Sequence, residues 1–375
     1  MTSRQRLIAA LNHRRPDCLP RYEIFFKSFV DFWRTTKAIP GGTDIREYYR
    51  IDVPTVLADQ RGPFTREEFT RETGGDVYYV RDSWGRLQKC LHSAAFFEVL
   101  ETAIGKKSDI DRLVFKDPCL SDEWFRSVEK GSRQNGDRFA SVSGTMGLYQ
   151  ACAWLRGEIQ FLMDLVEDES FCRSLIDKLR KFLMIKGEQV LAKTDTWDTA
   201  LWVYDDFSVN TGPLFGPDVF ERLFLDPYRA MFSYWKSKGV RHIILHHDIM
   251  SPNSFPIIDM FKEAGLTGVQ GVYPTAGLSI KTFRERYGNS LSIIGGICNT
   301  HTLPFGSRKD IERQVAEVIE IGRDGGVVIG SHSIEGYIPV EHYDWYIEAL
   351  DEAEVANHDV RNVGRCLSQI PISLT

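Results

Sequence analysis

Apolar residues from position 139 onward occur in short continuous runs, separated by amphipathic stretches of a dozen or more residues. Such runs predict buried strands, and apolar positions that recur every three or four residues predict helices. Strands are expected at 139–144, 200–206, 242–248, 268–273, 291–297 and 326–331. Helices are expected near 150–166, 168–193, 216–237, 253–264, 278–287, 308–323 and 340–355. This alternation indicates a parallel sheet covered by helices.

The segment before residue 139 is less regular. Thr2 and Gln5 have the spacing of a capping box, which predicts a lead-in helix within 1–18 that stops before Pro16. Residues from about 60 to 135 are expected to form an irregular insertion. Within it, two alternating segments on either side of 82–85 predict a β-hairpin. We expect one domain over 1–375 that carries these helical and hairpin additions.

Polar residues gather where the predicted strands end. They are Asp205, Asp206, His246, His247, Asp248, Cys298, Asn299, Ser331 and His332. An open doubly wound sheet that binds a nucleotide would normally carry GxGxxG or GxxxxGK[ST], and the chain has neither motif. Barrel enzymes hold their catalytic groups at the carboxyl ends of the strands. The predicted fold class is therefore α/β, a (β/α)₈ TIM barrel.

The segment HIILHHD is the first candidate site. Alternation along a strand places His246 and Asp248 on one side and His247 on the other. The first two can share a metal ion, although spacing alone favours a hydrogen-bonded polar pair at a strand end. Zinc needs at least a third ligand, and spacing alone does not choose between His332 and Cys298.

Other candidates each have a structural alternative. Asp205 and Asp206 can bind a cation, a base or a hydroxyl group, although a helix N-terminus can also account for one acid. His332 is either a general acid, a metal ligand or a capping histidine. Cys298 is by default a small buried thiol, and Tyr149 by default a core residue. The predicted substrate-binding residues are Tyr149, Asp59, His247 and Glu335.

Composition narrows the class of protein. The 375 residues include 46 Lys+Arg and 52 Asp+Glu, so the net charge of −6 does not suggest a nucleic-acid surface. No apolar run is long enough for a membrane span, and the N-terminus lacks a signal core, so we expect a cytoplasmic protein. The seven cysteines are scattered without CxxC, which predicts reduced and mostly buried thiols.

Several motifs follow one another in a recognisable order. They are RQRLIAALNHRRPDCLPRYE at the start, YDD with LFGPDVFERLFLDPY, LHHD, GVQGVYP, SIIGGI and GSHSIEGYIPVEH. In order and spacing the chain resembles the uroporphyrinogen decarboxylase superfamily, and most of all its corrinoid-dependent methyltransferase branch. The resemblance covers nearly the whole chain and implies a uroporphyrinogen decarboxylase-like (β/α)₈ barrel.

The resemblance also implies a set of site residues. The arginine motif of true porphyrinogen decarboxylases is absent, since the matching stretch reads LPRYEIFFKSF. His246 matches the zinc-binding histidine of the methyltransferases, Asp248 stands where their first cysteine would be, and His332 stands near their second. Zinc with these ligands would be more Lewis-acidic than with thiolates, which suits an ether oxygen. Asp206, His332 and Asp205 are the predicted catalytic residues.

The predicted function is therefore a methyltransferase of the O-demethylation type. It would move a methyl group from a methyl ether or similar small donor to the cobalt of a corrinoid carried by a separate partner protein. Two alternatives stay open: a cofactor-free decarboxylase that uses Asp59 or Asp206, and a non-catalytic barrel that binds a tetrapyrrole or corrinoid. A homodimer is also left open.

Overall fold

The computed structural model describes residues 1–64, 68–72, 75–92, 97–272 and 274–367. The chain divides into two compact units, one formed by Met1–Pro54 with Val272–Thr375 and the other by Thr55–Gly271. Both units are α/β, with parallel strands connected through helices. The predicted strand at 268–273 includes Tyr273, which lies outside the described residues.

In the first unit, three parallel strands are ordered β1-β14-β13. They are β1 (Arg21–Tyr22), β13 (Ser292–Gly296) and β14 (Val327–Gly330). The helices are α1 (Ser3–Leu11), α2 (Lys27–Thr36), α3 (Ile45–Tyr48), η5 (Pro274–Ala276), α11 (Ile280–Tyr287), α12 (Thr302–Phe305), α13 (Arg308–Gly322) and α14 (Val340–Leu367). Every residue of β13 and β14 is buried, which explains why both read as continuous apolar runs.

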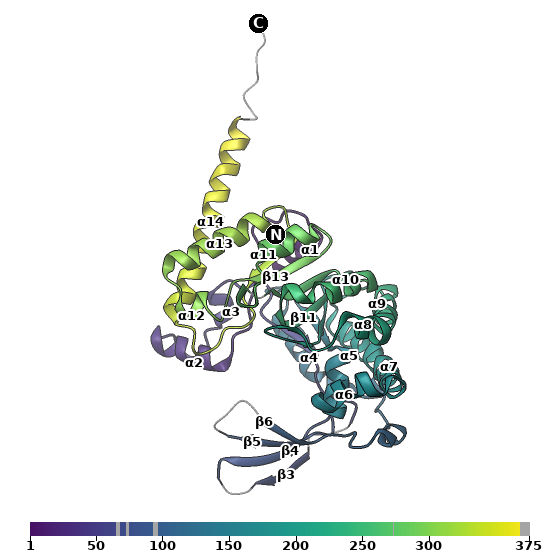
Figure 1. Cartoon of the computed structure of the whole chain (residues 1–375). Coiled ribbons are helices and arrows are strands. Elements are labelled where there is room, and N and C mark those ends of the chain that lie inside the picture. Colours follow the sequence, from purple (N-terminus) through teal and green to yellow (C-terminus); the bar gives the residue numbers. More distant parts are fainter. Residues whose placement is uncertain (65–67, 73–74, 93–96, 273, 368–375) are drawn as a thin grey trace. The chain divides into compact units, whose positions relative to one another are not determined.

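The lead-in helix α1 confirms the predicted capping box. The Thr2 side chain accepts a hydrogen bond from the Gln5 N–H at 3.2 Å, and the Gln5 side chain accepts one from the Thr2 N–H at 3.0 Å. These bonds satisfy backbone donors that a helix N-terminus would otherwise leave unpaired. At the other end of the unit, α14 extends away from the strands (Figure 1).

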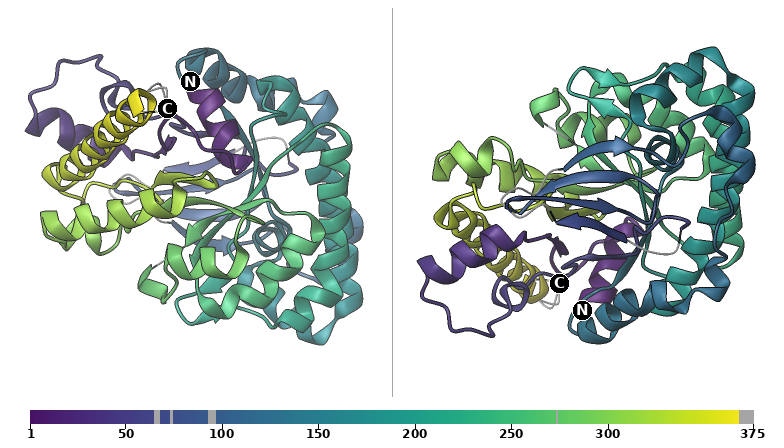
Figure 2. Two further views of the ribbon diagram at one scale, coloured as in Figure 1. Left: turned by 90° about the horizontal axis from the view of Figure 1, so that it is seen from above. Right: turned by 90° about the horizontal axis from the view of Figure 1, so that it is seen from below.

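The second unit holds five parallel strands in the order β12-β11-β8-β7-β2. They are β2 (Val56–Ala58), β7 (Val142–Met146), β8 (Leu201–Tyr204), β11 (Ile243–Met250) and β12 (Gly268–Val272). The helices are η1 (Lys107–Arg112), η2 (Pro118–Leu120), α4 (Asp122–Asn135), α5 (Leu148–Arg156), α6 (Glu158–Glu167), α7 (Glu169–Thr194), α8 (Pro217–Phe220), η3 (Glu221–Leu225), α9 (Asp226–Ser237), η4 (Pro252–Ser254) and α10 (Phe255–Ala264). A short pair, β9 (Ser208–Val209) and β10 (Gly212–Pro213), follows β8. The helices run along the outside of the parallel strands of this unit (Figure 2).

Two of the predicted helices are interrupted. The stretch 150–166 is split into α5 and α6 at Gly157, whose φ of 90° is incompatible with a continuing right-handed helix. The stretch 216–237 contains the π-helical turn η3 directly before Pro227, which lacks the N–H that an unbroken α-helix requires. Each interruption therefore follows from one residue, Gly157 in the first stretch and Pro227 in the second.

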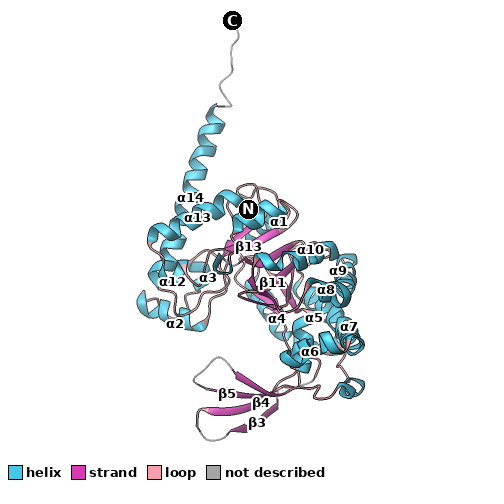
Figure 3. Ribbon diagram, in the orientation of Figure 1, coloured by secondary structure: helices cyan, strands magenta, loops and turns pink. Residues whose placement is uncertain are grey.

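The insertion forms a four-stranded antiparallel sheet, set apart from the parallel strands of its own unit (Figure 3). Its strands are β3 (Glu68–Glu72), β4 (Val77–Arg81), β5 (Leu87–Leu91) and β6 (Phe97–Glu101), in that order. The predicted hairpin is the central pair, with Tyr79 opposite Lys89. The outer strands β3 and β6 were not predicted, because neither has a clear alternation of apolar and polar residues.

The described residues bear on two predictions, the absence of a membrane span and the presence of reduced cysteines. Within the described residues, no helix combines the length and the apolar character needed to cross a bilayer. The six cysteines that are described are free thiols, of which Cys119 is exposed and Cys18 half-buried, while the other four are buried.

Candidate functional site

The end of β11 carries a histidine and a carboxylate on the same side of the strand. The Nε2 atom of His246 lies 3.2 Å from Oδ1 of Asp248, as the predicted alternation requires. On the other side of the imidazole ring, Nδ1 is hydrogen-bonded to Oε1 of Gln270 on β12. With Nδ1 donating to Gln270, Nε2 is the ring nitrogen that faces Asp248: it donates a proton to the carboxylate when the ring is charged and offers its lone pair when the ring is neutral.

This orientation fits a metal ligand. Metal-binding histidines almost always donate their second ring N–H to an oxygen acceptor, which selects the tautomer and holds the ring. Burial lowers the pKa of His246, but the hydrogen bond to Asp248 and the nearby charge of Asp206 outweigh it, so the pKa is raised. The nitrogen and the carboxylate together form a donor set that suits a divalent cation such as zinc.

Asp205 and Asp206 follow β8 and have different surroundings. Asp205 is fully buried, accepts a hydrogen bond from the Tyr228 hydroxyl and accepts another from the Gln150 N–H at 2.8 Å. Burial raises its pKa to about 7, although these hydrogen bonds act in the opposite direction. Because Gln150 belongs to the first turn of α5, Asp205 satisfies a helix N-terminus, which is the structural alternative considered for one of the two acids.

Asp206 is the more accessible of the two. Its Oδ1 accepts a hydrogen bond of 2.7 Å from the Asp248 N–H, and its side chain lines a cavity of about 880 Å³. Tyr149 lines the same cavity, and its hydroxyl donates to Oε1 of Glu158 at 3.3 Å. The sequence singled out Asp206 and Tyr149, but not Arg86 or Trp154, which also line this cavity.

His247 faces away from His246 and Asp248. Its Nδ1 is 2.7 Å from the Asp205 carbonyl oxygen and its Nε2 is 2.8 Å from the Ser208 hydroxyl. The ring also stacks on Phe207, with 4.0 Å between the centroids. Burial lowers the pKa of His247 to about 4. These contacts give His247 a role in holding β8, β9 and β11 together.

Asp59 follows β2, and two cationic side chains bind its carboxylate. Its carboxylate accepts from Nε of Arg61 at 2.9 Å and lies 3.2 Å from Nζ of Lys186. Burial lowers the pKa of Lys186 to about 8, against the opposing effect of Asp59. Asp59 and Arg61 line a second cavity of about 530 Å³ in the same unit.

In the first unit, His332 lies one residue beyond Ser331, just after β14, and is half-buried. No sequence pattern singled out Glu23, which follows β1 and is completely buried. Its two carboxyl oxygens accept from the Ser331 N–H at 3.1 Å and the Ser331 hydroxyl at 2.7 Å. Burial raises the pKa of Glu23 to about 8, while the bonds from Ser331 act to lower it. The only local signal is a carboxyl group directly before the apolar residues Ile24 to Phe26.

The remaining predicted residues of the first unit lie in the loops after β13 and β14. Burial raises the pKa of the Cys298 thiol, but hydrogen bonds from the Thr300 hydroxyl and from the backbone N–H groups of 300–302 outweigh it and lower the pKa. The side-chain amide of Asn299 donates to the Ser333 carbonyl at 3.1 Å. The Ser333 hydroxyl in turn donates to Glu335 at 3.4 Å.

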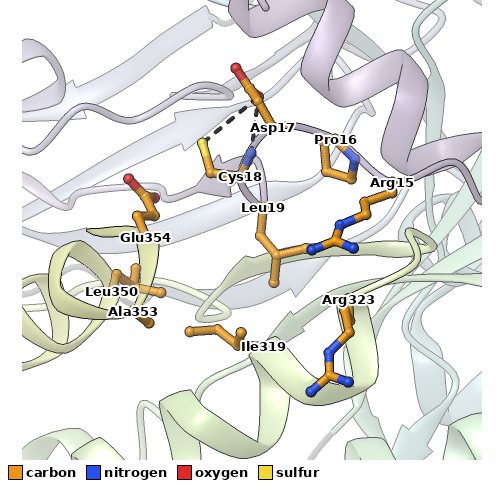
Figure 4. Close-up of a pocket in the computed structure, with 10 residues that line it drawn as sticks. All are labelled: Arg15, Pro16, Asp17, Cys18, Leu19, Ile319, Arg323, Leu350, Ala353 and Glu354. Atoms are coloured by element: carbon orange, nitrogen blue, oxygen red, sulfur yellow. Dashed lines mark hydrogen bonds between the residues drawn. The ribbon is translucent and has the colours of Figure 1, made fainter. Parts of the chain in front are cut away.

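The first unit also contains a small cavity of about 90 Å³, shown in Figure 4. Its walls include Cys18 and Leu19, just before β1, and Arg323, just before β14. It therefore lies near the amino ends of these strands, and catalytic groups in barrels stand at the opposite, carboxyl ends.

Residues 105–353 match the model of the family described as uroporphyrinogen decarboxylase (URO-D). The chain belongs to this family, and its fold is the (β/α)₈ TIM barrel that the sequence predicted. Among solved structures, a methyltransferase from Methanosarcina mazei is similar, with a TM-score of 0.64 and 17% sequence identity. The match covers 94% of this chain and 99% of that chain, and it shows a shared fold. No curated protein matches the chain.

Proposed function

We propose that the protein is a methyltransferase that takes a methyl group from a small methyl donor, a methyl ether or a similar compound. The acceptor in this proposal is the cobalt of a corrinoid carried by a separate partner protein. Membership of the URO-D family and the similar fold of the methyltransferase from Methanosarcina mazei support the reaction class. The orientation of His246 by Gln270, with Nε2 directed at Asp248, is the observation on which the proposal depends most.

We further propose that His246 and Asp248 hold a divalent metal ion, zinc, together with a third ligand. Both residues follow a strand, His332 after β14 and Cys298 after β13, and the carboxyl ends of barrel strands share one rim. We prefer His332, because the Cys298 sulfur is already engaged by the Thr300 hydroxyl and by the backbone N–H groups of 300–302. When bound, the metal would supply a Lewis acid for an oxygen leaving group.

The chain's own residues would orient the donor and the ligands. Asp206 accepts the backbone N–H of Asp248 and lines the large cavity, so it is positioned to contact a substrate there. Tyr149 is a second candidate contact in that cavity. Asp205 has two protein donors and would act indirectly, by holding α5 in place. If no metal is used, His332 is the candidate general acid.

The decarboxylase alternative has less support. It needs an aspartate that can stabilise a protonated substrate, and of its two candidates Asp59 is already bound by Arg61 and Lys186, which leaves only Asp206 in the large cavity. The arginine motif of the porphyrinogen decarboxylases is also absent from this chain.

The deciding experiment measures metal content in protein purified without added zinc, alongside methyl transfer to free cob(I)alamin. We expect about one metal ion per chain, and a parallel loss of metal and of transfer in His246→Ala, Asp248→Ala and His332→Ala. His92→Ala is the matched control, because His92 is exposed and lines neither cavity of its unit. Metal-free wild-type protein with full methyl transfer would refute the zinc site. Decarboxylation of a porphyrinogen without methyl transfer would refute the function itself.

A further inference from the structure

Arg86 lies immediately before the inserted strand β5 and is held rigidly. Only 8% of the residue is exposed, and its Nε donates to Oδ2 of Asp82 at 2.7 Å, with Nη2 2.6 Å from the same oxygen. Asp82 also accepts from the side chain of Gln88 and from the backbone N–H groups of Trp84 and Arg86. A carboxylate with this many donors is itself immobile, so it holds the guanidinium in one orientation.

The contact with Asp82 occupies one edge of the guanidinium. Nε and Nη2 face the carboxylate, whereas Nη1 has no hydrogen-bond partner among residues 75–92 and 97–272. The edge formed by Nη1 and the outer hydrogen of Nη2 is the fork that binds a carboxylate through two parallel hydrogen bonds. Arg86 is therefore an immobilised cation that still has a complete binding edge.

This arginine lies between two cavities with aromatic walls. It lines both the cavity of about 880 Å³ and the cavity of about 530 Å³. The guanidinium carbon stands 4.0 Å from the ring centroid of Trp154, and 5.6 Å from that of Phe97. Val99 and Leu100 of β6 add apolar surface to the larger cavity. The opposite wall of this cavity comes from α5 and α6, and Figure 1 shows these helices next to the inserted sheet.

The other charged groups of the larger cavity restrict what it can bind. Arg156 is already engaged, since it donates to Asp164 and to the carbonyl oxygens of Ile104 and Gly105. Glu101 is paired with Arg81, and Glu158 accepts a hydrogen bond from the Tyr149 hydroxyl. Asp206 adds a further negative charge. A single free guanidinium edge among acids suits one negative charge and disfavours a dianion such as a phosphate monoester.

We propose that Arg86 binds the carboxylate of the substrate, and that the methyl donor is therefore an apolar monocarboxylic acid. Its carboxylate lies against Arg86, its apolar body lies along Trp154 and β6, and its methyl group is directed to the part of the cavity lined by Asp206. This inference deepens the proposed function, because it names the class of the donor at the same site.

Calorimetric binding measurements in the absence of corrinoid test carboxylate binding by Arg86 separately from catalysis. The probes are 4-methoxybenzoate, its neutral analogue 4-methoxybenzamide, and the dianion phenyl phosphate. We expect wild-type protein to bind the benzoate at least tenfold more tightly than either analogue. Arg86→Met should lower the affinity for the benzoate at least tenfold, or about 1.4 kcal/mol, and Arg86→Lys should recover part of it.

Lys89→Met is the matched control, because it removes the same charge from the same sheet and Lys89 lines neither cavity. Its affinity for 4-methoxybenzoate should equal that of wild type. Two results with wild-type protein alone would overturn the proposal. One is equal affinity for 4-methoxybenzoate and 4-methoxybenzamide, and the other is no binding of 4-methoxybenzoate. If 4-methoxybenzoate binds through Arg86 but is not demethylated, the methyltransferase function is refuted and the carboxylate-binding role of Arg86 stands. If Arg86→Met leaves methyl transfer unchanged, the carboxylate-binding role of Arg86 is refuted and the methyltransferase function stands.

Discussion

Glu23→Gln is expected to stabilise the protein increasingly as the pH rises from 6 to 8. Glu23 is completely buried, and within the described part of the chain its carboxyl group has only the Ser331 N–H and hydroxyl as hydrogen-bond partners. Burial raises its pKa from the ordinary value of 4.5 to about 8. The folded protein therefore holds a proton that the unfolded chain releases.

The sign and size follow from this difference in pKa. Below pH 4.5 the group is protonated in both states and costs nothing; as the pH rises toward 8 only the unfolded state ionises, and stability is lost. Proton linkage gives a loss of roughly 2 kcal/mol at pH 6 and roughly 4 kcal/mol at pH 8. The glutamine of the variant would keep a neutral amide against Ser331 and would not suffer this loss. The advantage of the variant should therefore grow by about 2 kcal/mol over these two pH units.

The assay is urea unfolding of both proteins at pH 6, 7 and 8, followed by tryptophan fluorescence. Comparing variant with wild type at each pH removes the contribution of other groups that titrate in this range, and the charged and titratable neighbours Arg21, Tyr343 and Tyr346 are the same in both proteins. Glu285→Gln, which removes an exposed carboxyl group of the same unit, controls for the change in net charge. A difference that stays constant or shrinks between pH 6 and pH 8 would show that Glu23 is not held protonated.

Three further substitutions test the second unit. Gln270→Leu removes the acceptor of the His246 Nδ1–H and should lower metal affinity about 10- to 100-fold, as measured by competition with a chelator, while the fold is retained. Tyr228→Phe removes the donor to Asp205 and the acceptor for the first turn of α5, so urea unfolding should show a loss of about 1–3 kcal/mol; an unchanged midpoint would contradict it. Gly271→Ala would place a Cβ 1.7 Å from a carbonyl oxygen of β11 at a φ of 123°, so we expect little soluble protein, and normal yield and thermal midpoint would argue against this close approach.

Local chemistry determined much of this fold. The capping box of α1 uses Thr2 and Gln5, three residues apart, and the hairpin β4–β5 depends on turn residues that are neighbours in the chain. The strands β8, β13 and β14 were predictable because burial on both faces requires continuous apolar runs. The pairing of His246 with Asp248 was likewise predictable, since it follows from the twofold alternation of one strand.

Contacts between residues distant in the chain decided the rest. Asp205 and Asp206 are adjacent and chemically identical, and only their partners on α5, α9 and β11 separate a buried helix cap from a cavity residue. Glu23 meets Ser331 across 308 positions, and Arg86 lines a cavity whose opposite wall comes from α5 and α6. No local sequence pattern predicts these long-range contacts. The pKa of a side chain, and the hydrogen-bonding edge that it leaves free, depend on the groups that folding brings against it.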